Sequence, residues 1–576
     1  MGIVPRMLDS RLPTLLTLLV ALWAGPALAE DKPLGEQPAD RIYRGGPIVT
    51  VDATGRVAEA LAVRGEHILA VGTEAEVAVH RGPETEEVDL AGKALLPGFI
   101  DAHGHVTQVG VLSVAVNVAS PPVGPITDIE QLQAALRERT AAAPAGTWVL
   151  GAGYDDGLLA EQRHPTRADL DAVSTEHPIA IVHVSLHLIV ANTAALAAAG
   201  ITADTPNPEG GVIRRGEGGK EPNGVLEETA MWAALAALPK PTLEEGFALL
   251  EAGLQRYVRA GFTTVQDGAT RADDWALLRA AAENDRLPVD VISYPVFLEA
   301  EAILAETVPG GEYGRLKLGG IKLILDGSPQ GKTAWLSEPY LVPPDGQEPG
   351  YRGYAWMKTE EAARVASGAY ERGLQLIAHA NGDAAADQLF AAVEKAQAEH
   401  GGGDRRTVLI HAQVLREEQL DRIRTLGIIP SFFISHTFFW GDWHRDSVLG
   451  PERAVRISPA ASALRRKIPF TFHNDAPVTP PDALRLIAAG VNRTTRSGVV
   501  LGPQERVPVE AAIRAVTRDA AYAHFEEGMK GSLEPGKLAD LVILSENPLT
   551  ADPGDLAGIR VLETVKGGKS LFRAEP

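Results

Sequence analysis

Short stretches in which apolar and polar residues alternate lie near both ends of the chain. Runs such as residues 47–52 and 60–65 show this pattern between about residues 41 and 90, and residues 538–544 and 561–569 repeat it near the other end. Alternation with a period of two predicts β-strands with one buried face. We therefore expect one small β-sandwich that is assembled from both termini.

The middle of the chain has a different pattern, in which apolar runs alternate with stretches rich in Ala, Leu, Glu and Arg. Such β–α alternation predicts an α/β fold with parallel strands joined by helices. Eight strands are the number that closes a (β/α)8 TIM barrel. The eight candidate runs are residues 98–105, 261–267, 289–296, 320–326, 374–379, 407–411, 427–433 and 469–475.

One long interval interrupts this regular spacing, between the first and second runs. Residues 121–238 are therefore interpreted as an insertion after barrel strand 1, with a strand of its own at 179–183. Loops that follow barrel strands rise over the face on which TIM barrels carry their active sites. The insertion is thus expected to shape a substrate pocket.

The first 29 residues have the pattern of a secretory signal peptide. Arg6 and Arg11 precede an apolar run at 15–22, and Ala27-Leu28-Ala29 forms an A-x-A cleavage site. A membrane anchor would need about 20 apolar residues, and this run is shorter. We expect a periplasmic or secreted protein in which residues 30–95 and 531–576 form the sandwich and 96–530 the barrel.

Composition narrows the chemistry that this chain can use. With 45% hydrophobic and 22% charged residues it is typical of a globular protein. It contains no Cys, so neither disulfides nor thiolate metal ligands are possible. Its net charge of −21 disfavours nucleic acid and anionic membranes as partners and otherwise mostly reflects solubility. The expected partner is a small-molecule substrate.

Histidines stand where several of the predicted strands end. His103 and His105 flank Gly104 at the end of the first run, and alternate strand residues point to the same face. His379 and His411 end two successive later runs. Each alone could be a hydrogen-bonded core residue, but together they lie at the carboxyl-terminal face of the barrel and predict a metal site.

Two further residues could complete this site. Asp475 ends the last run and could both bind a metal and take a proton from water; the alternative is a helix N-cap before Pro477. Lys322 lies in an apolar segment, where a lysine must be neutralised, paired or modified. Carboxylation would make it a bridging carbamate for two metals, whereas an ion pair with Asp326 or another acid would make it structural.

In several sequence segments the chain resembles amidohydrolase family 3 of the amidohydrolase superfamily, in the branch that includes the N-substituted formamide deformylases. The resemblance extends over essentially the whole mature chain. The segments that carry it are ALAV at 60–63, LPGFIDAHGH at 96–105, DGS at 326–328, PY at 339–340, HANGD at 379–383, HAQ at 411–413, DAPV at 475–478 and GSLEPGKLAD at 531–540.

The resemblance implies roles for the strand-end residues. His103 and His105 would hold one metal ion, His379 and His411 would complete that site or hold a second ion, and Asp475 would be ligand and general acid/base. Lys322 would be the bridging position. The set implied for metal binding is His103, His105, Lys322, His379, His411 and Asp475.

Two departures from the family pattern concern the substrate. His473-Asn474 replaces the small Gly-Ser pair that is expected before Asp475, and the segment 435–444 is unusually aromatic. His187, in the insertion, has a setting in which the resembling proteins place a histidine toward the pocket. His436, after the seventh run, is a second candidate for substrate binding.

The resulting expectation is an exported hydrolase that uses one or two Zn²⁺ ions, or another divalent metal, to cleave an amide, formamide or N-acyl C–N bond with water. Deamination or cyclic-amide opening on the same scaffold is the alternative reaction. A non-catalytic metal-binding module is a third possibility, but none of the candidate ligands or Asp475 is lost from this sequence. The sequence does not report the oligomeric state.

Overall fold

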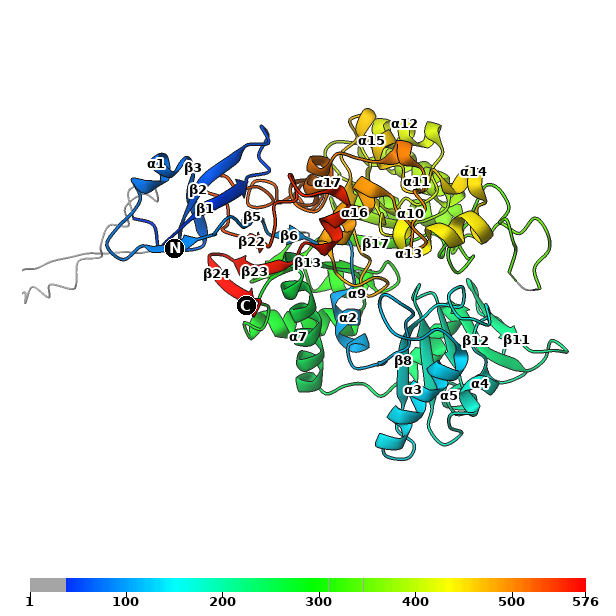
Figure 1. Cartoon of the computed structure of the whole chain (residues 1–576). Coiled ribbons are helices and arrows are strands. Elements are labelled where there is room, and N and C mark those ends of the chain that lie inside the picture. Colours follow the sequence, from blue (N-terminus) through cyan, green and yellow to red (C-terminus); the bar gives the residue numbers. More distant parts are fainter. Residues whose placement is uncertain (1–37, 309, 345, 576) are drawn as a thin grey trace, which may run out of the picture. The chain divides into compact units, whose positions relative to one another are not determined.

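The computed structural model describes residues 38–308, 310–344 and 346–575 (Figure 1). The expected signal segment, residues 1–29, lies outside the described residues. Among the residues that are described, no helix has the length and apolar character that crossing a bilayer requires.

All eight predicted barrel runs contain a β-strand, and the TIM-barrel fold class is confirmed. The helices between these strands pack around them, and their apolar faces form the largest core of the chain. The barrel strands are β6 (Phe99–Ile100), β13 (Phe262–Thr270), β14 (Asp290–Pro295), β16 (Leu316–Leu318) with β17 (Gly320–Ile324), β18 (Gln375–Ala380), β19 (Val408–His411), β20 (Ile429–Phe432) and β21 (Thr471–Phe472).

Helices follow the barrel strands along the chain (Figure 1). Several begin with a hydrogen-bonded cap, as at Thr242, whose side chain accepts from Glu245 N. The helices are α2 (Val106–Leu112), α7 (Leu243–Arg259), α8 (Ala272–Glu283), α9 (Ala300–Ala305), α10 (Thr359–Glu371), α11 (Asp383–His400), α12 (Glu417–Leu426), α13 (His436–Trp443), α14 (Pro451–Ala454), α15 (Ala460–Arg465), α16 (Ala483–Asn492), α17 (Val509–Ala515) and α18 (Arg518–Ala523).

The barrel strands belong to two five-stranded sheets. The consecutive strands β16 and β17, one in each sheet, are joined by a bend. β16 pairs with β14, and β17 pairs with β18, with Gly319 between them. A Cβ on Gly319 would lie 2.5 Å from the Tyr294 ring, so the bend requires glycine. Beyond β21 and β6, the backbone of Asp475 donates to His103 O at 3.2 Å and His105 donates to Ala476 O at 2.8 Å. These two bonds join the last barrel segment to the first.

Strands from both ends of the described chain form one eight-stranded sheet. Its order is β24-β23-β22-β5-β1-β2-β3, with β4 also paired to β1. β22 pairs antiparallel with β5, the strand that leads into the barrel. The members are β1 (Arg41–Val49), β2 (Val57–Arg64), β3 (His67–Gly72), β4 (Glu86–Asp89), β5 (Ala94–Pro97), β22 (Leu541–Leu544), β23 (Val561–Lys566) and β24 (Lys569–Arg573), with helix α1 (Glu74–Ala78) beside them. The domain boundaries at 30–95, 96–530 and 531–576 stay a prediction.

The insertion after the first barrel strand contains a six-stranded sheet and its own apolar cores. The strand expected at 179–183 is present as β9. Its strands are β7 (Val116–Asn117), β8 (Val149–Tyr154), β9 (Ile179–His183), β10 (Leu188–Ala191), β11 (Gly211–Arg215) and β12 (Pro222–Glu228), with helices α3 (Ile129–Ala142), α4 (Arg167–Asp171), α5 (Thr193–Ala198) and α6 (Thr229–Ala236).

A buried ionic cluster ties the last part of the chain to the barrel. Asp290, at the start of β14, accepts hydrogen bonds from Lys530 Nζ and, at 2.6 Å, from Lys566 Nζ. Lys566 also donates to Asp540 at 2.8 Å. Burial would raise the pKa of Asp290, but the two ammonium groups hold it well below its usual value. The acid is therefore ionised at neutral pH, and its partners are residues of the final segment.

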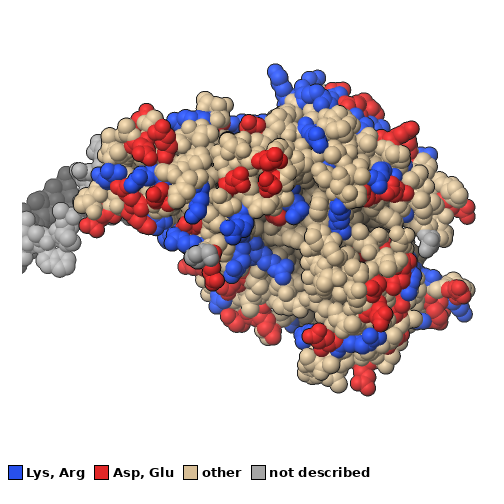
Figure 2. All heavy atoms as spheres, in the orientation of Figure 1, with Lys and Arg blue, Asp and Glu red and all other residues tan. Residues whose placement is uncertain are grey.

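Acidic and basic side chains are interspersed over the face of the molecule in Figure 2. The net charge of −21 is thus not gathered into one acidic patch on that face. Such mixing of both signs is typical of protein surfaces.

Candidate metal centre

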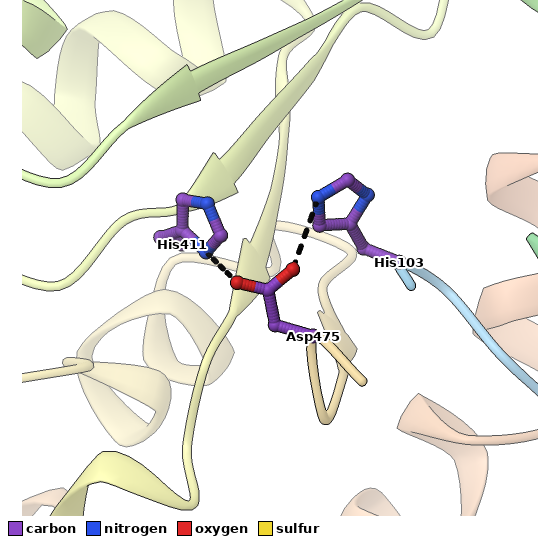
Figure 3. Close-up of side chains that lie close together, drawn as sticks. All are labelled: His103, His411 and Asp475. Atoms are coloured by element: carbon purple, nitrogen blue, oxygen red, sulfur yellow. Dashed lines mark ion pairs between the residues drawn. The ribbon is translucent and has the colours of Figure 1, made fainter. Parts of the chain in front are cut away.

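The six residues singled out at the predicted strand ends come together at one end of the barrel. His103 and His105 follow β6, Lys322 lies on β17, His379 on β18 and His411 ends β19, while Asp475 follows β21. Figure 3 shows the centre of this group, where Asp475 lies between His103 and His411. Asp475 Oδ1 is 3.5 Å from His103 Nε2, and Oδ2 is 3.8 Å from His411 Nδ1.

The backbone at this centre has an unusual conformation. His411, Ala412 and Asp475 all have positive φ, at 76°, 50° and 53°. Side chains other than glycine rarely occupy this left-handed region, and such residues cluster at functional sites. Here the conformation turns the two strand-end side chains toward each other. Asp475 is therefore not the N-cap of the next helix, a role that Asp482 has for α16.

Asp475 has a buried oxygen that protein donors leave unsatisfied. His105 Nε2 lies 3.2 Å from Asp475 Oδ1, but this oxygen lacks a partner with hydrogen-bond geometry, as does His105 Nδ1. Burial would raise the pKa of Asp475, but His105 and the neighbouring imidazoles lower it below its usual value. The carboxylate is thus an anion whose free oxygen is available to a cation.

Lys322 lies against His103 and not against Asp326. Its Nζ is 2.9 Å from His103 Nε2, and burial lowers the pKa of Lys322 to about 7. Asp326 instead accepts backbone hydrogen bonds from Asn381 and Gly382, at 2.9 and 2.8 Å. The alternative of a Lys322–Asp326 ion pair is therefore wrong, and with a pKa of about 7 roughly half of the lysine amine is neutral at pH 7.

His379 and His411 form the other half of the centre. His411 Nε2 lies 2.9 Å from His379 Nδ1, and both rings are buried. Burial and the neighbouring imidazoles and Lys322 lower the pKa of each ring well below 6.5. Both are therefore neutral near pH 7, which is the form that binds metals.

The donors present fit a divalent metal ion. Four imidazoles, one carboxylate with an unsatisfied oxygen and one lysine of lowered pKa converge without any thiol. His103, His411 and Asp475 each offer a ligand atom within 4.8 Å of the others. Nitrogen and oxygen donors of this kind suit Zn²⁺ and similar divalent ions.

Comparison with known proteins agrees with this arrangement. A profile described as "Amidohydrolase family" matches residues 86–572, which is most of the chain. The chain belongs to the amidohydrolase family. The protein is accordingly a metal-dependent amidohydrolase, an enzyme class that acts on C–N bonds.

Several relatives match this amidohydrolase along almost their whole length. The N-substituted formamide deformylase of Arthrobacter pascens is 28% identical over 92% of this chain and 98% of its own. Protein LONG AFTER FAR-RED 3 of Arabidopsis thaliana is 30% identical over 93% and 92%. The crystal structure of a metal-dependent hydrolase from Pyrococcus horikoshii covers 89% of this chain and 99% of that chain, at a TM-score of 0.71 and 23% identity. That likeness shows the fold.

Two residues next to the histidines help to position them, and neither was predicted from the sequence. Gln266, on β13, places its Oε1 2.6 Å from His103 Nδ1 and donates to Ala102 O. Gly104 separates the two first histidines because a Cβ there would lie 2.4 Å from Asp101 Oδ2 and from Tyr257 Oη. Gln266 occurs in a predicted strand, but nothing in the pattern distinguishes it from a core polar residue.

His187 lies beside the centre, as a substrate-facing role would require. Its ring centroid is 5.1 Å from that of His379, and its Nδ1 is 2.7 Å from Glu228 Oε2. Burial lowers the pKa of His187, but the charge and hydrogen bond of Glu228 raise it above the usual value. Glu228 is itself buried, at φ 51°, and was not selected from the sequence.

His436 lies at the start of α13, within the aromatic segment. Its ring stacks on that of His444, with Nδ1 2.8 Å from His444 Nε2, and its centroid is 4.4 Å from that of Phe433. Burial and His444 lower its pKa well below 6.5. The ring is buried and already paired, and its role in substrate binding stays a prediction. His183, which ends β9 in the insertion, is buried with its Nε2 3.0 Å from Asp156 Oδ1.

Proposed function

We propose that this amidohydrolase cleaves the C–N bond of an amide, formamide or N-acyl substrate with water, and that His103, His105, His379, His411, Asp475 and Lys322 hold one or two Zn²⁺ ions. The observation that carries the proposal is the buried Asp475 carboxylate. One of its oxygens lacks a hydrogen-bond partner and faces the imidazoles of His103 and His105. Another divalent metal would fit the same donors.

The residues of the site divide the chemistry between them. A bound divalent ion would supply Lewis-acid polarisation of the scissile carbonyl and a lowered pKa for water. Asp475, ionised and at the mouth of the barrel, accepts the proton from the attacking water and delivers it to the leaving nitrogen. His187 is placed to contact the substrate from the insertion side.

Two observations support an amide or formamide substrate with an apolar group. One is the full-length similarity to a protein named N-substituted formamide deformylase. The other is an apolar cluster next to His436, in which Phe433, Phe439 and Trp440 pack with Val184 and Leu186 of the insertion. An apolar wall of this kind suits an alkyl or aromatic substituent on the substrate nitrogen or acyl group.

A substrate screen tests this function. Metal-loaded protein should release amine from N-alkyl and N-aryl formamides or N-acyl amines faster than from unsubstituted amides. Chelator-treated protein should contain no stoichiometric metal and should be inactive until a divalent ion is restored. Faster turnover of aminopurines or cyclic imides would overturn the amide assignment in favour of deamination or ring opening. Metal-free protein with full activity would overturn the metal centre.

We further propose that Lys322 is carboxylated by CO₂, with release of one proton, and would then hold two metal ions. Its lowered pKa supports this, because carbamate formation requires the neutral amine. Lys322→Ala should lose one metal equivalent and most activity, with partial rescue by acetate or propionate, whose carboxylate can occupy the bridging position. Metal content by elemental analysis and turnover with added acid are the measurements.

A matched substitution separates this role from a general effect of losing a lysine. Lys358 is exposed and caps α10 without a side-chain hydrogen bond, so Lys358→Ala should leave metal content unchanged. Lys322→Ala with the full metal content and activity of the original protein would show that the lysine is structural.

We also propose that the protein is exported and that residues 1–29 are removed. The support is the sequence pattern alone, with Arg6 and Arg11 before the apolar run and Ala27-Leu28-Ala29 after it. Mass spectrometry of the protein from a secreting host should find Glu30 at the N-terminus. A double substitution of Leu16 and Leu19 by Arg should abolish cleavage. Intact chain confined to the cytoplasm of that host would contradict the proposal.

A further inference from the structure

An additional histidine, His473, lies inside the proposed metal centre. It follows β21, two residues before Asp475, and its side chain is completely buried. Its Nε2 lies 3.1 Å from His411 Nδ1, and its Nδ1 lies 2.8 Å from Ser431 Oγ. The ring centroid is 5.3 Å from that of His103. His473 thus connects a proposed ligand to a serine on the neighbouring strand β20.

The contacts of His411 fix where its ring hydrogen must lie. A neutral imidazole carries one hydrogen and one lone pair on its two nitrogens. His411 Nε2 faces His379 Nδ1 at 2.9 Å, so this is the nitrogen that shares an ion with His379. The hydrogen is then on His411 Nδ1. Asp475 Oδ2 is 3.8 Å from this nitrogen, too far for a hydrogen bond, whereas His473 Nε2 is within reach.

The same reasoning fixes the state of His473. If its Nε2 accepts from His411, the single hydrogen of the ring is on Nδ1, where Ser431 Oγ accepts it. Ser431 is buried and on the strand next to both histidines. A continuous set of hydrogen bonds therefore runs from His411 through His473 to Ser431.

We infer that His473 is a positioning residue of the metal centre, which holds His411 in the form that presents Nε2 to the ion, with Ser431 holding His473 in turn. The inference rests on the proposed role of His411 as a ligand. Hydrogen-bond partners of this kind orient a ligating imidazole and raise its basicity, and their loss weakens metal binding by about 10–100-fold.

Metal affinity tests this role without relying on turnover. The protein is stripped of metal and titrated with Zn²⁺ against a chromophoric chelator. His473→Leu fills the space but leaves His411 Nδ1 without an acceptor, so one Zn²⁺ should bind about 10–100-fold more weakly. His473→Gln offers an oxygen near the position of Nε2 and should recover most of the affinity. Ser431→Ala should show a smaller loss.

A buried histidine elsewhere provides the matched control. His177 lies in the insertion with its Nδ1 3.0 Å from Thr147 O, so His177→Leu removes a similar hydrogen bond away from the metal centre. It should bind Zn²⁺ as the original protein does. Absorption spectra of the Co²⁺-loaded proteins should show the same coordination in the original, His473→Gln and His473→Leu proteins.

The outcomes separate this inference from the proposed function. Stoichiometric metal in the original protein, with unchanged affinity in His473→Leu, would overturn the positioning role alone. Complete loss of one ion with an altered Co²⁺ spectrum would also overturn it, because His473 would then be a ligand. An original protein that binds no metal would overturn both. If His473→Leu does not fold, the other two variants decide. The inference is contradicted if Ser431→Ala binds Zn²⁺ as tightly as the original protein does and His473→Gln binds it poorly.

Discussion

Asp475→Asn is expected to lower kcat by about 10²–10⁴-fold, the range for loss of a general acid/base. The amide keeps the shape of the side chain, but it cannot accept the proton of the attacking water or return it to the leaving nitrogen. The carboxylate is ionised near neutral pH because the neighbouring imidazoles hold its pKa below the usual value. Steady-state kinetics on the best substrate of the screen, with metal content measured in parallel, provide the test.

A nearby aspartate offers the control for this substitution. Asp482 caps α16 by accepting from Arg485 N at 2.9 Å, and asparagine is an equally good N-cap. Asp482→Asn should therefore leave kcat unchanged. Retention of more than about one tenth of kcat by fully metal-loaded Asp475→Asn would rule out the proton-transfer role, since that loss is below the range for such a group.

A chain that ends at Lys530 is expected not to fold. It lacks β22, the partner of β5, and with it the fully buried side chains of Leu541, Val542 and Leu544. Burying each such side chain contributes about 1.5–3 kcal/mol, so these three alone approach the 5–15 kcal/mol by which proteins are typically stable. Lys566, a partner of the partly buried Asp290, is lost as well.

Circular dichroism and thermal melting of the shortened chain test this expectation. A chain that ends at Arg573 keeps all three final strands and should melt as the original does. The longer truncation should give insoluble protein or lack a cooperative transition. A soluble chain that ends at Lys530 with full activity would show that the barrel is stable without the sheet built from both ends.

The sequence predicts the barrel well because each strand leaves a strong local signal. The runs at 374–379 and 407–411 are apolar, are flanked by helix-forming stretches and end in histidine. The structure has β18 and β19 there, with His379 and His411 at their carboxyl ends. Strand lengths are less predictable, because pairing decides them. The first run spans 98–105, whereas β6 is limited to Phe99–Ile100, after which the chain turns to present His103.

The partners of several site residues could not be predicted from the sequence, because they are distant along the chain and meet only in the fold. Glu228 is 41 positions from His187 and resembles any other acid at the start of a helix until the fold places the two side chains together. His473 stands out only as a departure from a family pattern, and its contacts with Ser431 and His411 depend on how three strands align. Lys322 is selected because it is out of place in an apolar run, but which partner it meets is decided in space.

The separate cores of the insertion bear on how this enzyme could evolve. Its six-stranded sheet packs on apolar side chains of its own, such as Leu136, Ile181 and Val190, while the proposed ligands are fixed by barrel strands. Residues of the insertion that approach the centre, including Leu186 and His187, stand on the segment between β9 and β10. Given the proposed substrate-facing role of His187, exchange of side chains on this one segment would alter which molecules are accepted and leave the proposed metal ligands in place. New substrate ranges are therefore accessible to this scaffold through few substitutions.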